Sequence, residues 1–337
     1  MSDVGMNRTL PILSIRIAVA AVTVGLAVFG AGCETNQIKP PVDTNAVIWT
    51  QITTPSGTGT LEPLFPDWRD STITFNYTEV LGPTVNFHIG LVQQDGSNVT
   101  LFREAGPTRD VFPRWVNDTI LVYSSNKGGN GHYLIWYRNL SSGRTINLRG
   151  VPSPDSWQPT PRPGLPSLAY TDGPNFQQGR IALIPDTAAV SEVFLSPDTL
   201  KAGEPDWDPA GNRLCFTADD PSGARNLWLM TLSGTSVVSM RRLTTDGVHD
   251  VNPRFSPDGT KIVFRSDRSG KSGVWWVSPD SAQMAPRLIA FEDVERTIVS
   301  PAWSPDGKEL VVSSGAKNPT SLLGDDRALF ILSNLGF

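Results

Sequence analysis

The residues that could do chemistry in this sequence are few and dispersed. The 337-residue chain has three histidines, His88, His132 and His249, and none of them falls in an H-x-H or H-E-x-x-H pattern. A metal site or an acid–base centre would need histidines that converge with carboxylates. We interpret the three as surface or hydrogen-bonded residues, and we predict no metal, no cofactor and no catalytic constellation.

Two short stretches resemble parts of known catalytic motifs, and neither is complete. GKSG at 270–273 matches the end of a phosphate-binding loop, but Arg265 stands where the first glycine is needed and no helical periodicity follows. The chain contains no G-x-S-x-G, the pattern that sets a nucleophilic serine on a sharp turn. The sequence therefore favours a protein that is not an enzyme.

The N-terminal 32 residues have the order of a signal peptide. Arg8 and Arg16 precede an apolar run over 17–32, and Cys33 follows directly. The ending GAGC resembles a bacterial lipobox, which implies cleavage before Cys33, acylation of this cysteine and a membrane anchor. Glu34, which stands where an Asp would signal retention at the inner membrane, favours the outer membrane. The alternative is an uncleaved anchor helix, although the run is shorter than the ~20 residues that span a bilayer.

Composition narrows the class of partner. The chain has 28 Lys and Arg against 33 Asp and Glu, a net charge of -5, and its basic residues are scattered. Nucleic-acid affinity arises from clustered Lys and Arg, so we expect no nucleic-acid partner. With 30 Gly and 28 Pro, turns should be frequent and strands short. The second cysteine, Cys215, lies in the apolar stretch RLCFTA and should be a buried, unreactive thiol.

A repeat runs through the rest of the chain. Its copies begin at prolines spaced by 46 to 48 residues: Pro66, Pro113, Pro159, Pro205, Pro253 and Pro301. Two positions after the proline stands an aromatic residue: Trp68, Trp115, Trp207, Phe255 and Trp303, with Pro161 as the exception in the degenerate third copy. The recurring tryptophans indicate core packing, whereas Trp49 and Trp157 lie outside the pattern. In the clearest copies SPDG follows, the signature of a type I turn.

Each copy contains four short runs of strand-forming residues, and units of this length are typical of propeller blades. We therefore predict an all-β, six-bladed β-propeller over 46–337, built from four-stranded antiparallel blades, with 33–45 as a flexible tether. The sixth copy lacks residues for its outermost strand, and VIWTQITT at 47–54 has strand composition without a copy of its own. We expect this N-terminal strand to complete the last blade and close the ring, which removes an open edge.

The pattern PxWSPDGxxIxF, best preserved in copies four to six, resembles the WD40-like (PD40) repeats of the TolB-type β-propeller family. The resemblance covers 66–337 and implies a propeller in the bacterial cell envelope, facing the periplasm. It also implies a protein partner such as a peptidoglycan-associated lipoprotein. The protein that gives the family its name carries an α/β domain before the propeller, and the 32 residues between Cys33 and Pro66 are too few for it. The lipobox-like cysteine is a second departure.

The first strand of each blade faces the axis of a propeller, so residues just before the repeat prolines are candidates for lining its channel. The candidate binding residues are Arg109, Asp110, Asp155, Lys201, Glu204, His249, Asp250 and Asn252. They suit a polar throat or a docking surface for a basic peptide. The alternative is that they are solvated loop residues without a binding role. We expect a monomeric, lipid-anchored, non-catalytic scaffold for a protein or peptide. The alternatives are an envelope propeller that binds or degrades polysaccharide, and a structural spacer.

Overall fold

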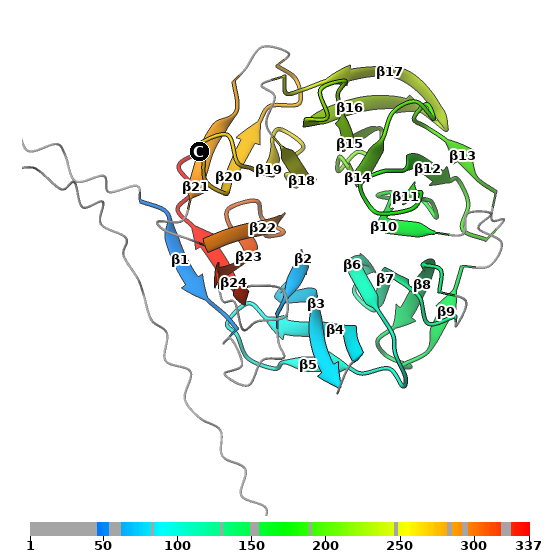
Figure 1. The fold of residues 1–337 in the computed structure, drawn as a ribbon, viewed down its shortest axis with the longest axis vertical. Helices are drawn as coiled ribbons and strands as arrows, with labels where there is room; N and C mark the ends of the chain where they lie inside the picture. Colours follow the sequence, from blue (N-terminus) through cyan, green and yellow to red (C-terminus); the bar gives the residue numbers. More distant parts are fainter. Residues whose placement is uncertain are drawn as a thin grey trace, which may run out of the picture.

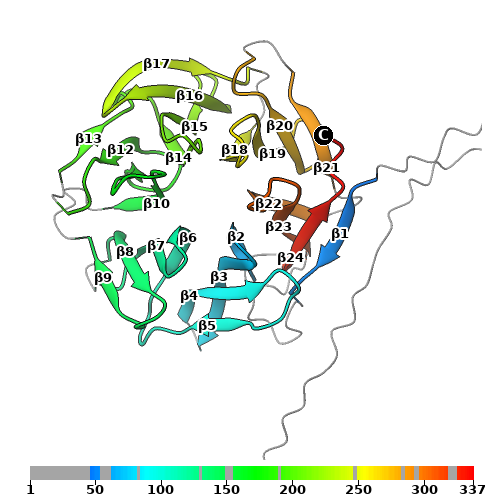
Figure 2. The same ribbon diagram turned by 180° about the vertical axis from the view of Figure 1, so that it is seen from behind.

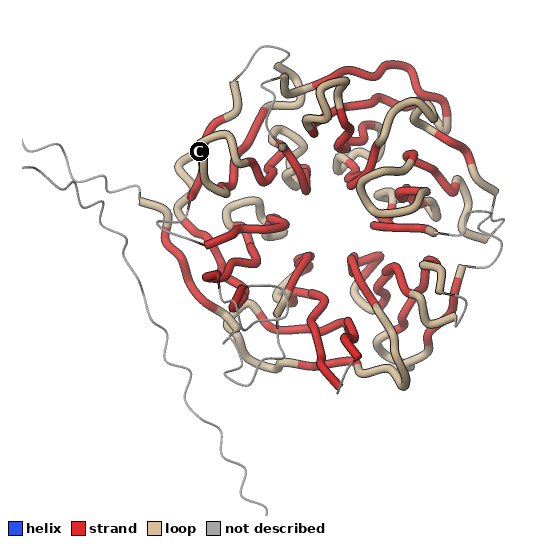
Figure 3. The backbone as a smooth tube through the Cα atoms, in the orientation of Figure 1, coloured by secondary structure: helices blue, strands red, loops and turns tan. Residues whose placement is uncertain are grey.

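The structure is a computed structural model, and it describes most of the chain that follows the predicted tether. The described residues are 46–53, 62–81, 84–128, 131–148, 155–188, 191–245, 249–281, 285–291, 296–317 and 325–337. The predicted signal peptide (1–32), Cys33 and the tether (33–45) lie outside these ranges. Within them the regular elements are all strands (Figure 3), and no helix there is suited to crossing a membrane.

Six four-stranded antiparallel sheets stand around a common axis, as Figure 1 shows, and the prediction of a six-bladed propeller is confirmed. Blade 1 contains β2 (Leu64–Arg69), β3 (Thr72–Leu81), β4 (Thr84–Gln93) and β5 (Thr100–Phe102). Blade 2 contains β6 (Asp110–Asn117), β7 (Ile120–Ser125), β8 (Leu134–Asn139) and β9 (Thr145–Asn147). Blade 3 contains β10 (Ser156–Pro161), β11 (Leu168–Asp172), β12 (Arg180–Ile184) and β13 (Val193–Phe194).

The second half of the ring has the same plan. Blade 4 contains β14 (Ala202–Trp207), β15 (Arg213–Asp219), β16 (Arg225–Ser233) and β17 (Ser236–Arg242). Blade 5 contains β18 (Asp250–Phe255), β19 (Ile262–Ser266), β20 (Gly273–Val277) and β21 (Arg287–Phe291). Blade 6 contains β22 (Arg296–Trp303), β23 (Leu310–Lys317), β24 (Asp325–Ser333) and β1 (Ile48–Gln51). Within each blade the strand that begins a repeat is innermost (Figure 2).

The chain enters every blade at the same face of the ring. Because the strands of a blade alternate in direction, all innermost strands begin on one face, here called the entry face, and end on the other, the exit face. The exit face carries the turns between the first two strands. In blade 5 this turn is closed by hydrogen bonds from the Ser256 amide to the Lys261 carbonyl (2.8 Å) and from the Gly259 amide to the Ser256 carbonyl (2.8 Å). SPDG therefore serves as a turn, as expected.

The core lies between blades. The aromatic residue two positions after the repeat proline belongs to a buried cluster shared with the blade before it: Trp68 of blade 1, for example, lies in one cluster with Ala302 and Val311 of blade 6. Trp207 of blade 4 packs in the same way against Leu183 of blade 3. Each blade thus buries both faces, which explains why the middle strands are apolar on both sides.

The ring closes through strands from the two ends of the sequence. β1 pairs antiparallel with β24 in a register that sets Trp49 opposite Leu332, and the Ile52 amide donates to the Leu329 carbonyl at 2.9 Å. The Trp49 and Phe330 rings meet edge to face, with centroids 5.9 Å apart. The N-terminal strand therefore completes the last blade, as predicted.

Candidate functional site: the central throat

Every innermost strand has the same irregularity where it meets the axis. The strand register shifts at the repeat proline in all six blades, which marks a β-bulge. The residue before the proline has a positive φ, between 50° and 59°, in every blade. These residues, here called the pre-proline ring, are Phe65, Phe112, Gln158, Glu204, Asn252 and Ser300. Because all six blades share the strain, it belongs to the architecture and is not a mark of catalysis.

The pre-proline ring lines a cavity of about 50 Å³ on the axis. One side of the ring is aromatic, with the Phe65 and Phe112 rings 4.4 Å apart. The other side is polar and is organised by Glu204, which is 5% exposed. Its carboxylate accepts hydrogen bonds from the amide (2.9 Å) and side chain (3.0 Å) of Asn252, and from the Thr217 hydroxyl (3.0 Å). Blades 4 and 5 are therefore joined at the mouth of the throat.

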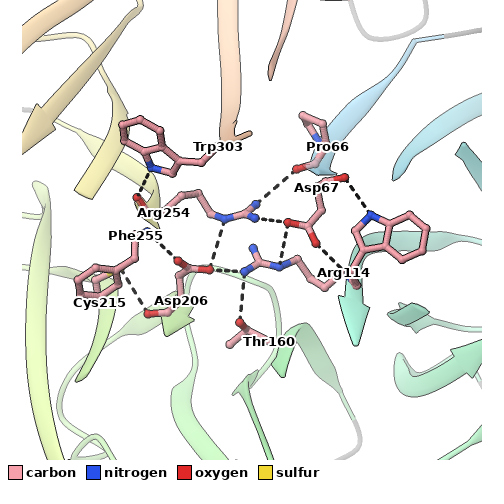
Figure 4. A network of polar contacts seen from close by, with 10 residues as sticks. Pro66, Asp67, Arg114, Thr160, Asp206, Cys215, Arg254, Phe255 and Trp303 are labelled. Carbon is pink, nitrogen blue, oxygen red and sulfur yellow. Dashed lines mark hydrogen bonds and ion pairs between the residues drawn. The ribbon is translucent and has the colours of Figure 1, made fainter. Parts of the chain in front are cut away.

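Four charged side chains form the floor of this cavity. They are Asp67, Arg114, Asp206 and Arg254, here called the ion-pair ring, and each directly follows a repeat proline (Figure 4). Arg114 contacts Asp67 (3.6 Å) and Asp206, and Arg254 contacts Asp206 (3.3 Å) and Asp67. Each of the two guanidinium groups thus contacts both carboxylates, and the four side chains form one network. In blades 3 and 6 the same position holds Thr160 and Ala302, so the order Asp, Arg, small residue occurs twice around the axis.

Main-chain groups fix the two carboxylates. The Trp115 amide donates to Asp67 at 2.9 Å, and the Phe255 amide donates to Asp206 at 2.8 Å, in each case from the following blade. Burial by itself would lower the pKa of Arg114, but the Asp67 and Asp206 carboxylates outweigh burial and raise that pKa. The network is therefore a charge-balanced element at the centre of the fold.

An aromatic shelf extends the mouth toward the entry face. It consists of Phe65, Phe112, Tyr133, Trp157 and Phe176, from blades 1 to 3. The Tyr133 and Trp157 rings lie 3.9 Å apart, and the Phe176 ring lies 5.2 Å from that of Phe112. All but Phe112 are partly exposed. The mouth thus offers an apolar shelf on one side and the Glu204–Asn252 pair on the other.

The predicted site residues divide into three groups. Glu204 and Asn252 are brought together in the throat, as described. Arg109, Lys201 and His249 are exposed, and Asp155 is half-buried. Asp155 accepts a hydrogen bond from the Tyr133 amide at 2.9 Å, which supports the aromatic shelf. These four residues belong to the entry face outside the pre-proline ring.

Asp110 and Asp250 do not line the cavity, contrary to our expectation of a channel position. Asp110 is 2% exposed, and burial raises its pKa to about 6. Asp250 is fully buried and forms an ion pair with Arg268, in which one guanidinium nitrogen donates to both carboxylate oxygens, at 2.7 and 2.8 Å. Each is the first residue of an innermost strand and pairs with a serine of the second strand, so its side chain is enclosed within the blade.

The ion-pair ring was missed by sequence reasoning, although the repeat contains a signal for it. The residue after the proline reads Asp, Arg, Thr, Asp, Arg, Ala through the six copies, and this alternation of charge is visible without a structure. The three histidines lie in separate surroundings. Among the described residues no group of three or more His, Cys, Asp or Glu side chains is arranged to hold a metal ion.

Residues 163–328 match the family model described as the TolB beta propeller domain (PD40). The chain carries a TolB-like β-propeller. A comparison with curated protein sequences gives no significant match.

Solved structures share the fold. TolB from Acinetobacter baumannii is similar with a TM-score of 0.53 and 18% identity, over 74% of this chain and 60% of that protein. The chain thus spans less than two thirds of that TolB. A putative TolB from Agrobacterium tumefaciens has a TM-score of 0.52 and 20% identity, over 65% of this chain and 74% of that protein. An oligogalacturonate lyase from Vibrio parahaemolyticus has a TM-score of 0.57 and 12% identity, over 86% and 94%.

Proposed function

We propose that the chain is a scaffold of the bacterial cell envelope that binds a protein or peptide at the mouth of the throat and has no catalytic role. The observation that carries this proposal is the combination of an aromatic shelf with a buried acidic residue above a floor of ion pairs. A shelf of half-exposed aromatic rings is typical of the anchoring centre of an interface. The TolB-like fold supports a docking role and an envelope setting.

The mouth favours a segment that offers an apolar side chain beside a hydrogen-bond donor or positive charge. The apolar group would lie on Trp157 and Tyr133, and the donor would face Glu204 on the opposite side. Because the ion-pair ring lies below, the segment enters from the entry face and ends at the cavity instead of passing through the ring.

The test is capture of partners from envelope extracts by the full chain. Trp157→Ser removes the central ring of the aromatic shelf, and Glu204→Gln removes the negative charge of the Glu204 carboxylate. Each variant is expected to reduce recovery of the partner at least about tenfold. Val238→Ser, at a residue that is 66% exposed on the outer strand β17, is the control and should leave recovery unchanged. Equal recovery with all three variants would reject the throat as the binding site.

Anchoring through Cys33 is a separate part of the proposal. Wild-type chain from cells should partition into the detergent phase, and Cys33→Ala should remain in the aqueous phase with the same fold. Wild-type protein in the aqueous phase would show that the lipid anchor does not exist.

A second candidate function is binding of envelope polysaccharide. It is favoured by the partly exposed rings of Tyr133 and Trp157, because sugar rings stack on aromatic side chains. Binding of the full chain to immobilised envelope polysaccharides, lost in Trp157→Ser and retained in Val238→Ser, would support this function. An absence of binding leaves the protein or peptide partner as the better assignment.

A further inference from the structure

A groove on the exit face lies where the repeat departs from its own pattern. In five blades an aromatic residue stands two positions after the repeat proline, near the end of the innermost strand, and four of these residues, Trp68, Trp207, Phe255 and Trp303, are only 5–8% exposed. In blade 3 this place is taken by Pro161. The register is unchanged, since Pro161 pairs with Leu168 as Trp207 pairs with Leu214. A small ring therefore stands where the other blades place a large one.

The space that the aromatic residue would fill, and that Pro161 leaves empty, is open to solvent. The aromatic residue of each blade packs against the blade before it, so the one missing from blade 3 would lie against blade 2. There the structure has a groove of about 470 Å³, within the range of ligand sites. Val116, Ile120 and Tyr137 of blade 2 line one side, and Pro161 and Leu165 of blade 3 line the other.

The rim of the groove is apolar and exposed. Leu165 is 53% exposed and Ile146 is 57% exposed, and both line the groove. Together with the unfilled space between the blades, these two side chains form an exposed apolar patch. Such patches on a protein surface mark interaction sites.

The other blades show what the groove is shaped to accept. The Trp115 indole donates to the Asp67 carbonyl at 3.3 Å, and the Trp303 indole donates to the Arg254 carbonyl at 3.2 Å. In both cases the acceptor is the residue that follows the repeat proline of the preceding blade. The Trp68 indole instead donates to the Asp70 carbonyl of its own blade at 3.0 Å, so the acceptor differs between blades, and what the groove itself offers is an apolar slot.

Charge at the groove indicates what flanks the aromatic group. Arg144 is the one charged residue of its lining and is exposed. Its guanidinium forms no ion pair with any residue in the described part of the chain. An acidic residue beside the aromatic side chain would complement this charge.

We propose that the groove between blades 2 and 3 binds a tryptophan or phenylalanine side chain, next to an acidic residue, on an extended segment of a partner protein. The partner thereby supplies the ring that blade 3 lacks. This site lies on the face opposite the mouth of the throat and does not depend on it.

The experiment uses the full chain in detergent, with isotope-labelled Ile, Leu and Val methyl groups, and follows its NMR spectrum. The probe is N-acetyl-aspartyl-tryptophan amide, compared with N-acetyl-aspartyl-leucine amide and N-acetyl-lysyl-tryptophan amide. Saturable shifts are expected at Ile120, Ile146 and Leu165, with the first probe binding at least about fivefold more tightly than the other two.

Two variants test the geometry. Pro161→Trp fills the groove from within and is expected to abolish the shifts. Arg144→Glu lies on the surface and should fold even if Pro161→Trp does not; it is expected to weaken the aspartyl probe about fivefold and strengthen the lysyl probe. Val238→Ser, on the outer strand β17 of blade 4, is the control and should change neither affinity.

Three outcomes would overturn the proposal. The first is equal binding of the leucine and tryptophan probes, and the second is binding that survives both groove variants. The third is association of the chain with itself in sedimentation that Arg144→Glu abolishes, which would make the occupant a second copy.

Discussion

The guanidinium of Arg114 in blade 2 contacts the carboxylate of Asp206 in blade 4, 92 positions later in the sequence. Blades 2 and 4 are not neighbours, so this contact crosses the throat. Arg254 of blade 5 makes the complementary contact with Asp67 of blade 1, 187 positions away. Most contacts in a repeat architecture join adjacent units. The ion-pair ring therefore couples blades that the strand pairing leaves independent.

Arg114→Ala is expected to lower the free energy of unfolding by about 3 kcal/mol or more. The change leaves two largely buried carboxylates, Asp67 and Asp206, with Arg254 as their single cation. Denaturant unfolding followed by tryptophan fluorescence measures the loss. The matched control is Arg69→Ala: the Arg69–Asp118 pair is also in close contact, at 2.6 Å, but its side chains are 40% and 70% exposed. Arg69→Ala should lower the free energy of unfolding by less than about 1 kcal/mol. Equal losses in Arg69→Ala and Arg114→Ala would contradict a structural role of the ion-pair ring.

Asp110 should make the fold less stable as pH rises from about 4 to about 6. Burial raises the folded-state pKa of its carboxyl from 3.8 to about 6, so the folded state holds this proton more tightly than the unfolded chain does. The penalty is complete above pH 6. Asp110→Asn is therefore expected to be more stable than wild type at pH 7, by up to about 3 kcal/mol, and to lose this advantage near pH 4.

Asp258 provides a control of opposite sign for the pH experiment. Hydrogen bonds from Ser256 and the Thr260 amide lower the pKa of its carboxyl to about 2. Its stabilising contribution is present above the ordinary pKa and is lost as pH falls toward 2, so Asp258→Asn should destabilise at pH 7 and have little effect at pH 2. If the stability of Asp110→Asn and Asp258→Asn relative to wild type changed with pH in the same direction, the environments assigned to the two carboxyl groups would be wrong.

Removal of β1 should open the ring. A chain that begins at Ala46 retains the pairing of β1 with β24, whereas one that begins at Glu62 leaves β24 as an unpaired edge. We expect the shorter chain to melt several degrees lower and to associate as concentration rises, because unpaired edges pair with one another. Melting curves and sedimentation measure this. Identical behaviour of the two chains would mean that β1 contributes nothing to closure.

Cys215 should not react with thiol reagents in the folded protein. The side chain is fully buried, and burial raises the pKa of its thiol well above the usual value. In the Cys33→Ala background it is the single thiol of the chain. Labelling is expected to begin only when denaturant unfolds the propeller, with the same midpoint as fluorescence. Rapid labelling in native buffer would show that the core around blade 4 opens locally.

The repeat in the sequence determined the architecture of this protein. Six prolines at nearly constant spacing, each followed by an aromatic residue and four strand-forming runs, predict the number of blades and the order of strands. Ring closure by β1 (Ile48–Gln51) was also predictable, because the sixth copy lacks residues for its outermost strand and this segment has strand composition without a copy of its own. These features can be predicted because they depend on local patterns. Successive side chains of a strand point to opposite faces of the sheet, so the sequence of a strand shows which faces are buried.

Only the tertiary structure decided which residues meet at the axis. The bulge before each repeat proline adds one residue to the innermost strand and shifts the alternation of side chains. Glu204 and Asn252 consequently enter the throat, whereas Asp110 and Asp250, two residues before the same positions, are enclosed within the blades. Asp67, Arg114, Asp206 and Arg254 form one network because closure of the ring brings together residues that no local pattern relates.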